Sequence, residues 1–316
     1  MRLVFLGSGQ FAVPSLEHLC RRGLAPAAVI TQPDRPAGRG RRPAPTPLKV
    51  MARSLGLSVS HPESIGAPEA LAQLRDLDPD FLVVAAYGQI LTPEVLQVGR
   101  LAPVNLHASL LPRWRGASPI ARAILAGDPQ TGLTTMRMDA GIDTGDILLQ
   151  EEVKIGARET AGELEIRLAD LGGALLEKTL LGLQEGSLQP RPQPSEGVTR
   201  APRLSVDEAR LDWSLAADDL DRRVRAYNPR PVAWTEFRGQ RLKIWGSRPV
   251  SANVVPDGES PPGPGTVTVV SGDTLRVACG RAALDLLEIQ PAGGRRSTAR
   301  DAINGRTLRK DDRLGA

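Results

Sequence analysis

Short apolar runs alternate with stretches of helical spacing through the first half of the chain. Leu16 and Leu19, for example, share one face of a helix between the first two runs. Continuous apolar strands joined by helices are typical of a parallel sheet that is covered on both faces. The pattern therefore predicts an α/β, Rossmann-like domain with a mostly parallel sheet over residues 1–189. Its expected strands are Leu3–Leu6, Ala27–Ile30, Phe81–Ala85 and Leu101–Leu106.

The second half opens with a proline-rich segment and then changes its pattern. Residues 190–204 are rich in proline, which is typical of an interdomain linker. A helical pattern from Leu211 to Val224 follows, and the alternating segments after it predict a small antiparallel, OB-like β-barrel over residues 205–316. A flexible loop is expected at Pro256–Gly265. The expected strands are Val232–Phe237, Arg241–Trp245, Thr266–Val270, Leu275–Ala278 and Leu284–Ile289.

Length and composition agree with a globular protein of two domains. The chain has 316 residues, of which 41% are hydrophobic and 24% charged. The first apolar run enters a glycine turn at once, and no later segment is long and apolar enough to span a membrane. The sequence therefore predicts a cytoplasmic protein. Cys20 and Cys279 lie far apart without metal-ligand spacing, so we expect neither a disulfide nor a metal site there.

Basic residues gather in two clusters, although the formal net charge is only +4. A cluster of this kind is ordinarily a solvated surface, but one in each of two domains favours a polyanionic partner. The first cluster lies at residues 32–49, which we expect to form a loop, and the second, which includes Arg300, lies at residues 295–310. The candidate contacts are Arg39, Arg41, Arg42, Arg295 and Arg296.

Three polar residues form the candidate catalytic group. Asn105 and His107 stand two apart at the end of an expected strand, so their side chains share one face of the sheet. Asn105 offers neutral N–H donors and His107 can take or give a proton. Asp143, in an expected loop, could orient the imidazole. The alternative is a purely structural role, in which the amide and the imidazole cap a buried strand end through local hydrogen bonds.

Two other motifs suggest different chemistry. The turn at Gly7–Ala12 partly matches a dinucleotide-binding turn, and Asp34 lies at about the distance expected of a ribose-binding acid. Such a glycine turn can equally serve only to let a strand pass closely into a helix. Asp143–Gly145 matches the triplet of aspartic proteases, but that chemistry needs two aspartates that share a proton. A single triplet in an α/β half argues against a protease.

The candidate group also carries a resemblance to known proteins. Asn105, His107 and Asp143 match the catalytic triplet of the folate-dependent formyltransferases. Ser109–Gly116 is similar to the signature loop of that family, and Asp139–Gly145 agrees with it as well. Ser118 departs from the expected alanine, which puts nothing catalytic in doubt.

A narrower resemblance is to the methionyl-tRNA formyltransferases, and it extends over almost the whole chain. The basic loop Thr31–Arg42 resembles the loop that the tRNA-specific members place against the acceptor stem. Leu287–Gly294 resembles part of their second domain. Sugar and nucleotide formyltransferases share the catalytic motifs, so these two segments are what favour tRNA as the acceptor.

The resemblance implies a formyl transfer for translation initiation. It implies 10-formyltetrahydrofolate as donor, the α-amino group of initiator methionyl-tRNA as acceptor, and no metal or obligatory protein partner. Asn105 and His107 would stabilise the oxygen that becomes negative, and Asp143 would hold His107 and assist proton movement. The implied tRNA contacts are Arg39, Arg41 and Arg42 at the acceptor stem, with Arg295 and Arg296 farther along the backbone. The implied folate contacts are Tyr87, Gly88, Gln89, Ile90, Leu91, Ser109, Leu110, Leu111 and Pro112.

Two readings from other classes stay open at this stage. A nicotinamide oxidoreductase would use the turn at Gly7–Ala12. A non-catalytic RNA-binding protein would use the basic clusters but would leave Asn105, His107 and Asp143 without a purpose.

Overall fold

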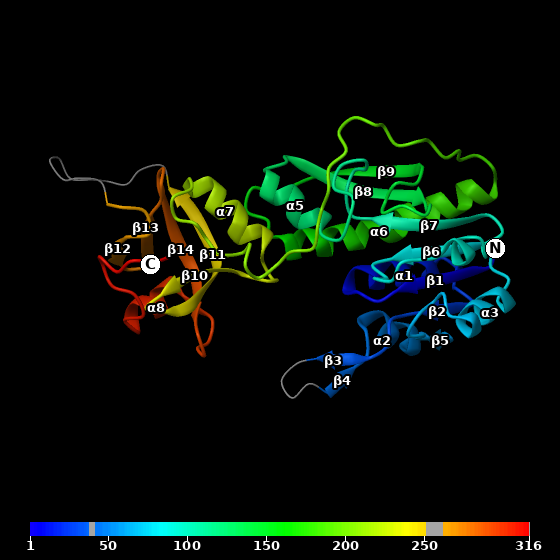
Figure 1. The fold of residues 1–316 in the computed structure, drawn as a ribbon, viewed down its shortest axis with the longest axis horizontal. Helices are drawn as coiled ribbons and strands as arrows, with labels where there is room; N and C mark the ends of the chain where they lie inside the picture. The colour runs from blue at the N-terminus through cyan, green and yellow to red at the C-terminus, as the bar shows by residue number, and fades with distance from the viewer. Residues whose placement is uncertain (38–41, 251–261, 316) are drawn as a thin grey trace. The chain divides into compact units, whose positions relative to one another are not determined.

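The computed structural model describes residues 1–37, 42–250 and 262–315 (Figure 1). Arg39, Arg41 and most of the expected loop Pro256–Gly265 lie outside these residues. The chain divides into two compact units. The first comprises Met1–Pro119, Gln130–Lys154 and Glu165–Ala201, and the second comprises Ile120–Pro129, Ile155–Leu164 and Pro202–Ala316.

A seven-stranded sheet forms the centre of the first unit, in the order β5-β2-β1-β6-β7-β8-β9. The pairings from β5 to β7 are parallel, whereas β8 and β9 are antiparallel to their neighbours. The prediction of a mostly parallel α/β sheet is therefore confirmed. The strands are β1 (Leu3–Gly7), β2 (Ala28–Ile30), β5 (Val59–Ser60), β6 (Phe81–Ala85), β7 (Ala102–His107), β8 (Gln130–Arg137) and β9 (Ile147–Lys154).

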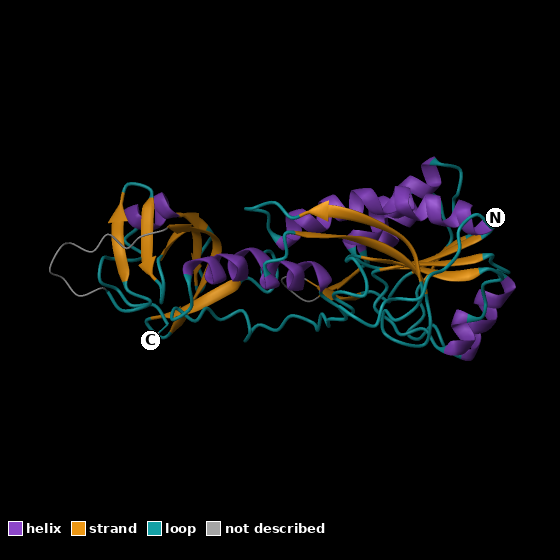
Figure 2. Ribbon diagram, turned by 90° about the horizontal axis from the view of Figure 1, so that it is seen from above, coloured by secondary structure: helices purple, strands orange, loops and turns teal. Residues whose placement is uncertain are grey.

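Helices lie on both faces of this sheet (Figure 2). α6 (Ala161–Gln184) covers the face of Leu106, because a Cβ added at its Gly172 would lie 2.5 Å from the Leu106 side chain. The opposite face packs against residues of α3 (Pro68–Asp76) and α4 (Pro93–Leu96) in one apolar cluster. The central strands are buried throughout, which explains their unbroken apolar sequence. The other helices of the first unit are η1 (Gln10–Ala12), α1 (Val13–Arg21) and α2 (Pro47–Ser54), whereas α5 (Pro119–Ala126) lies in the second unit except for its first residue.

The segment expected to be a loop at residues 32–49 contains regular structure. β3 (Arg35–Ala37) pairs with β4 (Arg42–Ala44) in an antiparallel hairpin that is separate from the main sheet (Figure 1). α2 then begins at Pro47, and the hydroxyl of Thr46 caps it by accepting from Lys49 N at 3.1 Å. The expectation of a continuous loop was therefore wrong, because proline at the first helical turn and a threonine cap favour a helix there.

The second unit contains an antiparallel sheet, as the alternating pattern predicts. Its strand order is β10-β11-β14-β13-β12, and β15 pairs with β14. Within the described residues no ladder joins the two end strands β10 and β12. The elements are α7 (Ala217–Ala226), β10 (Ala233–Phe237), β11 (Gln240–Val250), β12 (Val267–Ser271), β13 (Thr274–Ala278), β14 (Ala283–Pro291), β15 (Ser297–Thr298) and α8 (Ala299–Asn304).

The helix of this unit begins later than its apolar spacing predicts. α7 starts at Ala217, whereas the pattern starts at Leu211. Leu211 N instead donates to Trp234 O at 2.8 Å, beside a short bridge to β10. The Asp212 carboxylate accepts from Ser214 N at 3.0 Å and closes a local turn. Leu211 is buried all the same, but it lies in the segment before α7 and not in the helix that its spacing predicts.

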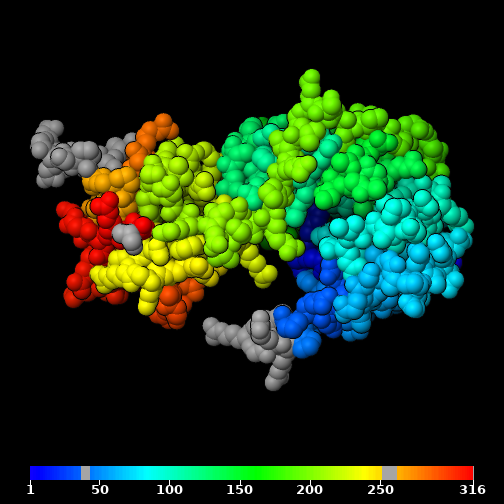
Figure 3. All heavy atoms as spheres, in the orientation of Figure 1, coloured from blue at the N-terminus to red at the C-terminus, as the bar shows by residue number. Residues whose placement is uncertain are grey.

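Most of the proline-rich segment, up to Ala201, belongs to the first unit, and the second unit resumes at Pro202, so the division between the units falls within residues 190–204. Arg191 bridges to Ile147 in β9, and Arg200 bridges to Arg115. The yellow-green chain that follows α6 accordingly runs over the outside of the first unit (Figure 3). In the part of the chain that the structure covers, no helix is long and apolar enough to cross a membrane.

The first glycine turn generates a prediction about stability. A Cβ at Gly7 would lie 2.7 Å from Ala85 O and 2.8 Å from the Leu48 side chain. We expect Gly7→Ala to lower the free energy of unfolding by about 1–3 kcal/mol, because the packed strand cannot move aside. Gly9→Ala is the control, since its nearest neighbour lies at 3.4 Å and its φ is −72°. Urea denaturation of both variants measures the difference, and equal losses would contradict the explanation.

Candidate active site

Asn105 and His107 lie side by side on one face of β7. They pair with Met136 and Thr134 of β8, and Asn105 also neighbours Val84 of β6. The two residues are 9% and 6% exposed. They occupy the face opposite to α6, because Leu106 between them points toward that helix.

The imidazole of His107 is held from both of its nitrogens. Its Nε2 lies 2.9 Å from the carbonyl oxygen of Trp114. Because a carbonyl oxygen can only accept, Nε2 carries the hydrogen of this bond. Nδ1 lies 3.6 Å from Oδ2 of Asp143, which is within ion-pair distance but too long for a hydrogen bond. Nδ1 is therefore the ring nitrogen left to gain or lose a proton beside a carboxylate.

Asp143 reaches His107 from a loop that folds over the face of the sheet. β8 runs antiparallel to β7, and its last residue, Arg137, pairs with Val104 rather than with the end of β7. The loop must therefore turn back by several residues to place Asp143 at His107. Its backbone has a positive φ of 54°, and its Oδ2 accepts a hydrogen bond of 2.8 Å from Gly116 N. Both constraints fix the carboxylate.

Glycine is required in this loop by close approach of the chain. A Cβ at Gly145 would lie 1.8 Å from Arg137 O, and one at Gly141 would lie 2.0 Å from the Thr144 hydroxyl. The Asp139 carboxylate accepts from Gly141 N at 3.0 Å and from the Thr144 hydroxyl at 2.7 Å. The motif at residues 139–145 therefore encodes a tight turn as well as Asp143.

The side-chain amide of Asn105 has no hydrogen-bond partner among the residues the structure describes. The amide is not among the fully buried polar groups that lack a partner, so it reaches solvent beside the imidazole and is open to a ligand. The alternative, that Asn105 caps a buried strand end, requires a bond that this amide does not make within the described residues.

The signature loop is held by buried hydrogen bonds. Ser109 is fully buried and its hydroxyl donates to Arg113 O at 2.7 Å. The hydroxyl of Thr134, also fully buried, donates to Ser109 O and accepts from Leu111 N. Leu111 is 3% exposed, whereas Leu110 and Pro112 are half-buried. The side chains of Ser109 and Leu111 therefore shape the loop from within and offer no surface to a ligand in this conformation.

The segment from Tyr87 to Leu91 follows β6. Tyr87 and Leu91 are buried, and burial raises the pKa of Tyr87 to about 12. Its hydroxyl makes no hydrogen bond within the described residues. Gln89 accepts from Ile65 N and donates to Pro62 O, so its amide is committed to a neighbouring loop. Ile90 is 85% exposed, which leaves an apolar side chain free for a partner.

The glycine turn after β1 serves strand packing. Gly7 touches Ala85 closely enough to exclude a side chain, which is the structural explanation of the motif. The carboxylate of Asp34 accepts from Lys49 Nζ at 2.7 Å, and this bond holds the pKa of Asp34 below its ordinary value. The Lys49 side chain is only 3% exposed. Asp34 is thus committed to anchoring α2, which argues against a role in binding ribose.

Two residues of the proline-rich segment reach the site, and the sequence did not single them out. Thr199 accepts from Trp114 N through its hydroxyl at 2.8 Å. Gln193 bonds to Arg115 and to the loop of Asp143. They are the two positions between 191 and 200 that are not exposed, a property that no local pattern in a proline-rich segment reveals.

The basic candidates can be placed only in part. Arg42 begins β4, while Arg39 and Arg41 lie outside the described residues. Arg295 is exposed. The guanidinium of Arg296 lies 4.7 Å from the ring centre of Trp245 and is bonded to Glu288, so this side chain is ordered by stacking and by an ion pair.

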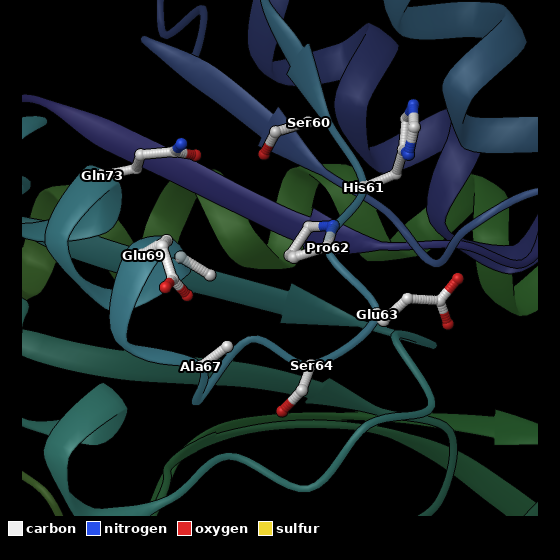
Figure 4. A pocket seen from close by; sticks show the side chains of 9 residues that line it. Ser60, His61, Pro62, Glu63, Ser64, Ala67, Glu69 and Gln73 are labelled. Atoms are coloured by element: carbon white, nitrogen blue, oxygen red, sulfur yellow. The ribbon is translucent and has the colours of Figure 1, made fainter.

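A cavity of about 510 Å³ lies elsewhere in the first unit, between β5 and α3. Figure 4 shows His61 and Glu63 directed apart at its rim, and Glu63 pairs with Arg35 at 2.9 Å. Among the described residues no group of three or more His, Cys, Asp or Glu side chains has a metal-binding arrangement. This cavity contains none of the predicted site residues.

The fold and the site define a two-domain α/β enzyme whose centre combines an amide, an imidazole and a carboxylate. Comparison with known families gives two matches: residues 1–180 match the family described as formyl transferase, and residues 203–307 match the formyl transferase C-terminal domain. The chain belongs to the formyl transferase family.

Curated relatives match over nearly their whole length. A protein of Halorhodospira halophila named methionyl-tRNA formyltransferase is 48% identical over 97% of both chains. One of the same name from Solibacter usitatus is 47% identical over 100% of this chain and 99% of its own.

Solved structures share the fold at low identity. A sugar 3N-formyltransferase, WlaRD, has a TM-score of 0.64 at 17% identity and covers 90% of this chain and 97% of its own. HypX from Aquifex aeolicus in complex with tetrahydrofolic acid has a TM-score of 0.63 at 15% identity over 96% of this chain and 47% of its own.

Thr134 and Thr131 on the same strand provide a matched test of the buried network. Thr134→Val removes a hydroxyl that serves Ser109, Leu111 and Gln150, and we expect it to cost about 1–3 kcal/mol for the buried groups left unpaired. Thr131→Val is the control, because that buried hydroxyl has no partner within the described residues and its loss should be neutral or stabilising. Denaturant unfolding measures both; a larger loss for Thr131→Val would contradict the network.

Proposed function

We propose that the protein transfers a formyl group from 10-formyltetrahydrofolate to the α-amino group of methionine on initiator methionyl-tRNA, for translation initiation. The observation that carries this proposal is the unpaired amide of Asn105 beside His107 and Asp143. Full-length relatives named methionyl-tRNA formyltransferase at 47–48% identity support the choice of acceptor.

The three residues divide the chemistry between them. Formyl transfer places negative charge on the formyl oxygen, and donors that face this oxygen lower the barrier. The N–H groups of Asn105 are free to do so. His107 takes up at Nδ1 the proton that the attacking α-amino group loses and returns it to the nitrogen from which the formyl group leaves, while the carboxylate of Asp143 at 3.6 Å attracts the charged ring. The bond from Nε2 to Trp114 O keeps the ring from rotating while this happens.

The residues after β6 and β7 fit a flat, partly apolar donor. When bound, 10-formyltetrahydrofolate supplies the formyl carbon and the nitrogen from which it leaves. Ile90 offers an exposed apolar side chain, and Tyr87 has a buried hydroxyl without a partner within the described residues. Gly88, Gln89 and Leu91 complete this segment. Backbone groups and the half-buried Leu110 and Pro112 contribute from the signature loop, while Ser109 and Leu111 hold that loop in shape.

The basic clusters would hold the tRNA. Arg42 begins β4, and Arg39 and Arg41 precede it in the sequence; we propose that these three arginines contact the acceptor stem. Arg295 and Arg296 would contact the backbone farther away. The two substrates meet every need of the reaction, so we further propose that the enzyme acts in the cytoplasm without an obligatory protein partner.

The direct test is formylation by single variants. Purified protein, methionyl-tRNA and 10-formyltetrahydrofolate should give a formylated α-amine. Asn105→Ala should lower the rate of transfer about 10²- to 10³-fold, the usual cost of one donor to a developing oxyanion. Binding of tRNA should not change, because Asn105 lies on the buried face of β7. Replacing methionyl-tRNA by a nucleotide-linked amino sugar tests the nearest rival acceptor; formylation of the sugar in preference to the tRNA would refute the proposal.

A second test concerns the tRNA-binding arginines. Replacing Arg39, Arg41 and Arg42 by alanine should make the slope of log affinity against log salt less negative, by about 0.7 to 0.9 for each phosphate that the variant no longer neutralises. The control replaces three exposed arginines on helices of the same unit, namely Arg21, Arg53 and Arg75. This triple variant changes the net charge by the same amount. Identical slopes for the two triple variants would show that the hairpin does not bind phosphates.

A further inference from the structure

The side-chain amide of Gln193 joins two parts of the site. Its Oε1 accepts from Nη2 of Arg115 at 2.7 Å and from Nε at 3.0 Å. Its Nε2 donates to the carbonyl oxygen of Asp143 at 2.8 Å and to that of Gly145 at 2.7 Å. A glutamine amide has two acceptor positions and two N–H groups, so this side chain uses its entire bonding capacity here.

The Asp143 turn needs such a restraint. Asp143 has a φ of +54°, a conformation that aspartate tolerates but does not prefer. The turn is part of a loop that leaves β8 and folds back over the sheet, so few ladder bonds hold it. The bonds from Gln193 fix the two carbonyl groups on either side of Thr144. They therefore set where the Asp143 carboxylate lies relative to His107.

The contact with Arg115 links this turn to the signature loop. Arg115 N donates to Thr199 O at 3.0 Å, and Arg115 O accepts from Ala201 N at 2.7 Å, so the arginine backbone is itself fixed. Gly116, the next residue, donates its N–H to the Asp143 carboxylate. Gln193 thus binds both the turn that carries the Asp143 carboxylate and Arg115, the neighbour of Gly116, whose N–H orients that carboxylate.

We propose that Gln193 is a positioning residue for formyl transfer, which holds the Asp143 turn against the signature loop so that the carboxylate faces His107. The inference rests on the proposed function, because it assigns Gln193 a role that acts through Asp143. A glutamine in a proline-rich connecting segment is ordinarily a solvated side chain. Gln193 differs because it is half-buried between exposed neighbours and every polar hydrogen of its amide points at the catalytic turn.

The first experiment compares Gln193→Ala and Gln193→Glu in steady-state formylation, at a temperature where circular dichroism shows each to be folded. Displacing a catalytic group by about 1 Å costs up to about 10²-fold in rate, so we expect kcat to fall about 10- to 100-fold in both variants. KM for methionyl-tRNA and for 10-formyltetrahydrofolate should stay the same, because Gln193 binds neither. Gln193→Glu keeps an acceptor for Arg115 but sets a carboxylate oxygen against two carbonyl oxygens. Full activity of Gln193→Glu would overturn the proposal.

The matched control is Gln189→Ala. Gln189 immediately precedes the proline-rich segment, is exposed, and its side chain bonds only to Gly186 O among the described residues. It should keep the unsubstituted kcat and KM. A fall in kcat as large as that of Gln193→Ala would show that the segment tolerates no change at all, and this would overturn the specific role of Gln193.

A double variant separates positioning from a general loss of stability. If Gln193 acts through Asp143, adding Gln193→Ala to Asp143→Asn should lower the single-turnover rate no further, whereas independent effects would multiply. Multiplication would overturn the proposal. The outcomes also distinguish it from the proposed function: an Asp143→Asn enzyme with unchanged rate refutes the catalytic assignment itself. A slow Asp143→Asn enzyme combined with a normal Gln193→Ala enzyme refutes only the inference about Gln193.

Discussion

The site depends on the fixed imidazole of His107. One nitrogen is bound to the carbonyl of Trp114 and the other faces the carboxylate of Asp143, so neither the orientation nor the hydrogen on Nε2 is free to change. The two restraints come from separate loops, one after β7 and one after β8. Each loop has its own buried network, that of Thr134 for the signature loop and that of Asp139 for the turn. The position of the imidazole therefore depends on the packing of both loops.

The antiparallel end of the sheet is what makes this convergence possible. In a wholly parallel sheet the loop after each strand at one edge leads back to a helix, and such loops approach one another only at strand ends. Here β8 reverses direction, so the loop between β8 and β9 starts near Val104 and crosses the face where Asn105 and His107 lie. The result is a carboxylate that faces His107 at the end of β7. This arrangement requires a strained turn, with a positive φ at Asp143 and glycines that have no room for a side chain. The hydrogen bonds from the Gln193 amide stabilise this turn.

Much of the fold could be predicted because it is written in local spacing. The apolar runs at β1, β6 and β7 and the alternating strands of the second unit are all present where the pattern places them. The errors fall where tertiary contacts outweigh spacing. Leu211 is buried by a bridge to β10 and lies before the helix that its spacing predicts. The prolines of residues 190–201 fix extended backbone, but spacing alone did not indicate that this backbone would pair with Ile147 and Arg115.

By itself, the sequence determined the fold class and that Asn105 and His107 share one face of a strand, because strand and helix periods are properties of neighbouring positions. Only the tertiary structure decided how Asp143 reaches the imidazole, that Ser109 and Leu111 are buried within the loop they shape, and that Gln193 and Thr199 complete the site. Asp143 and His107 meet through side chains that are far apart in the sequence, and Gln193 and Thr199 reach the site through backbone carbonyl and N–H groups. Every residue type except proline carries these same groups, so no side-chain pattern could have indicated which ones would meet.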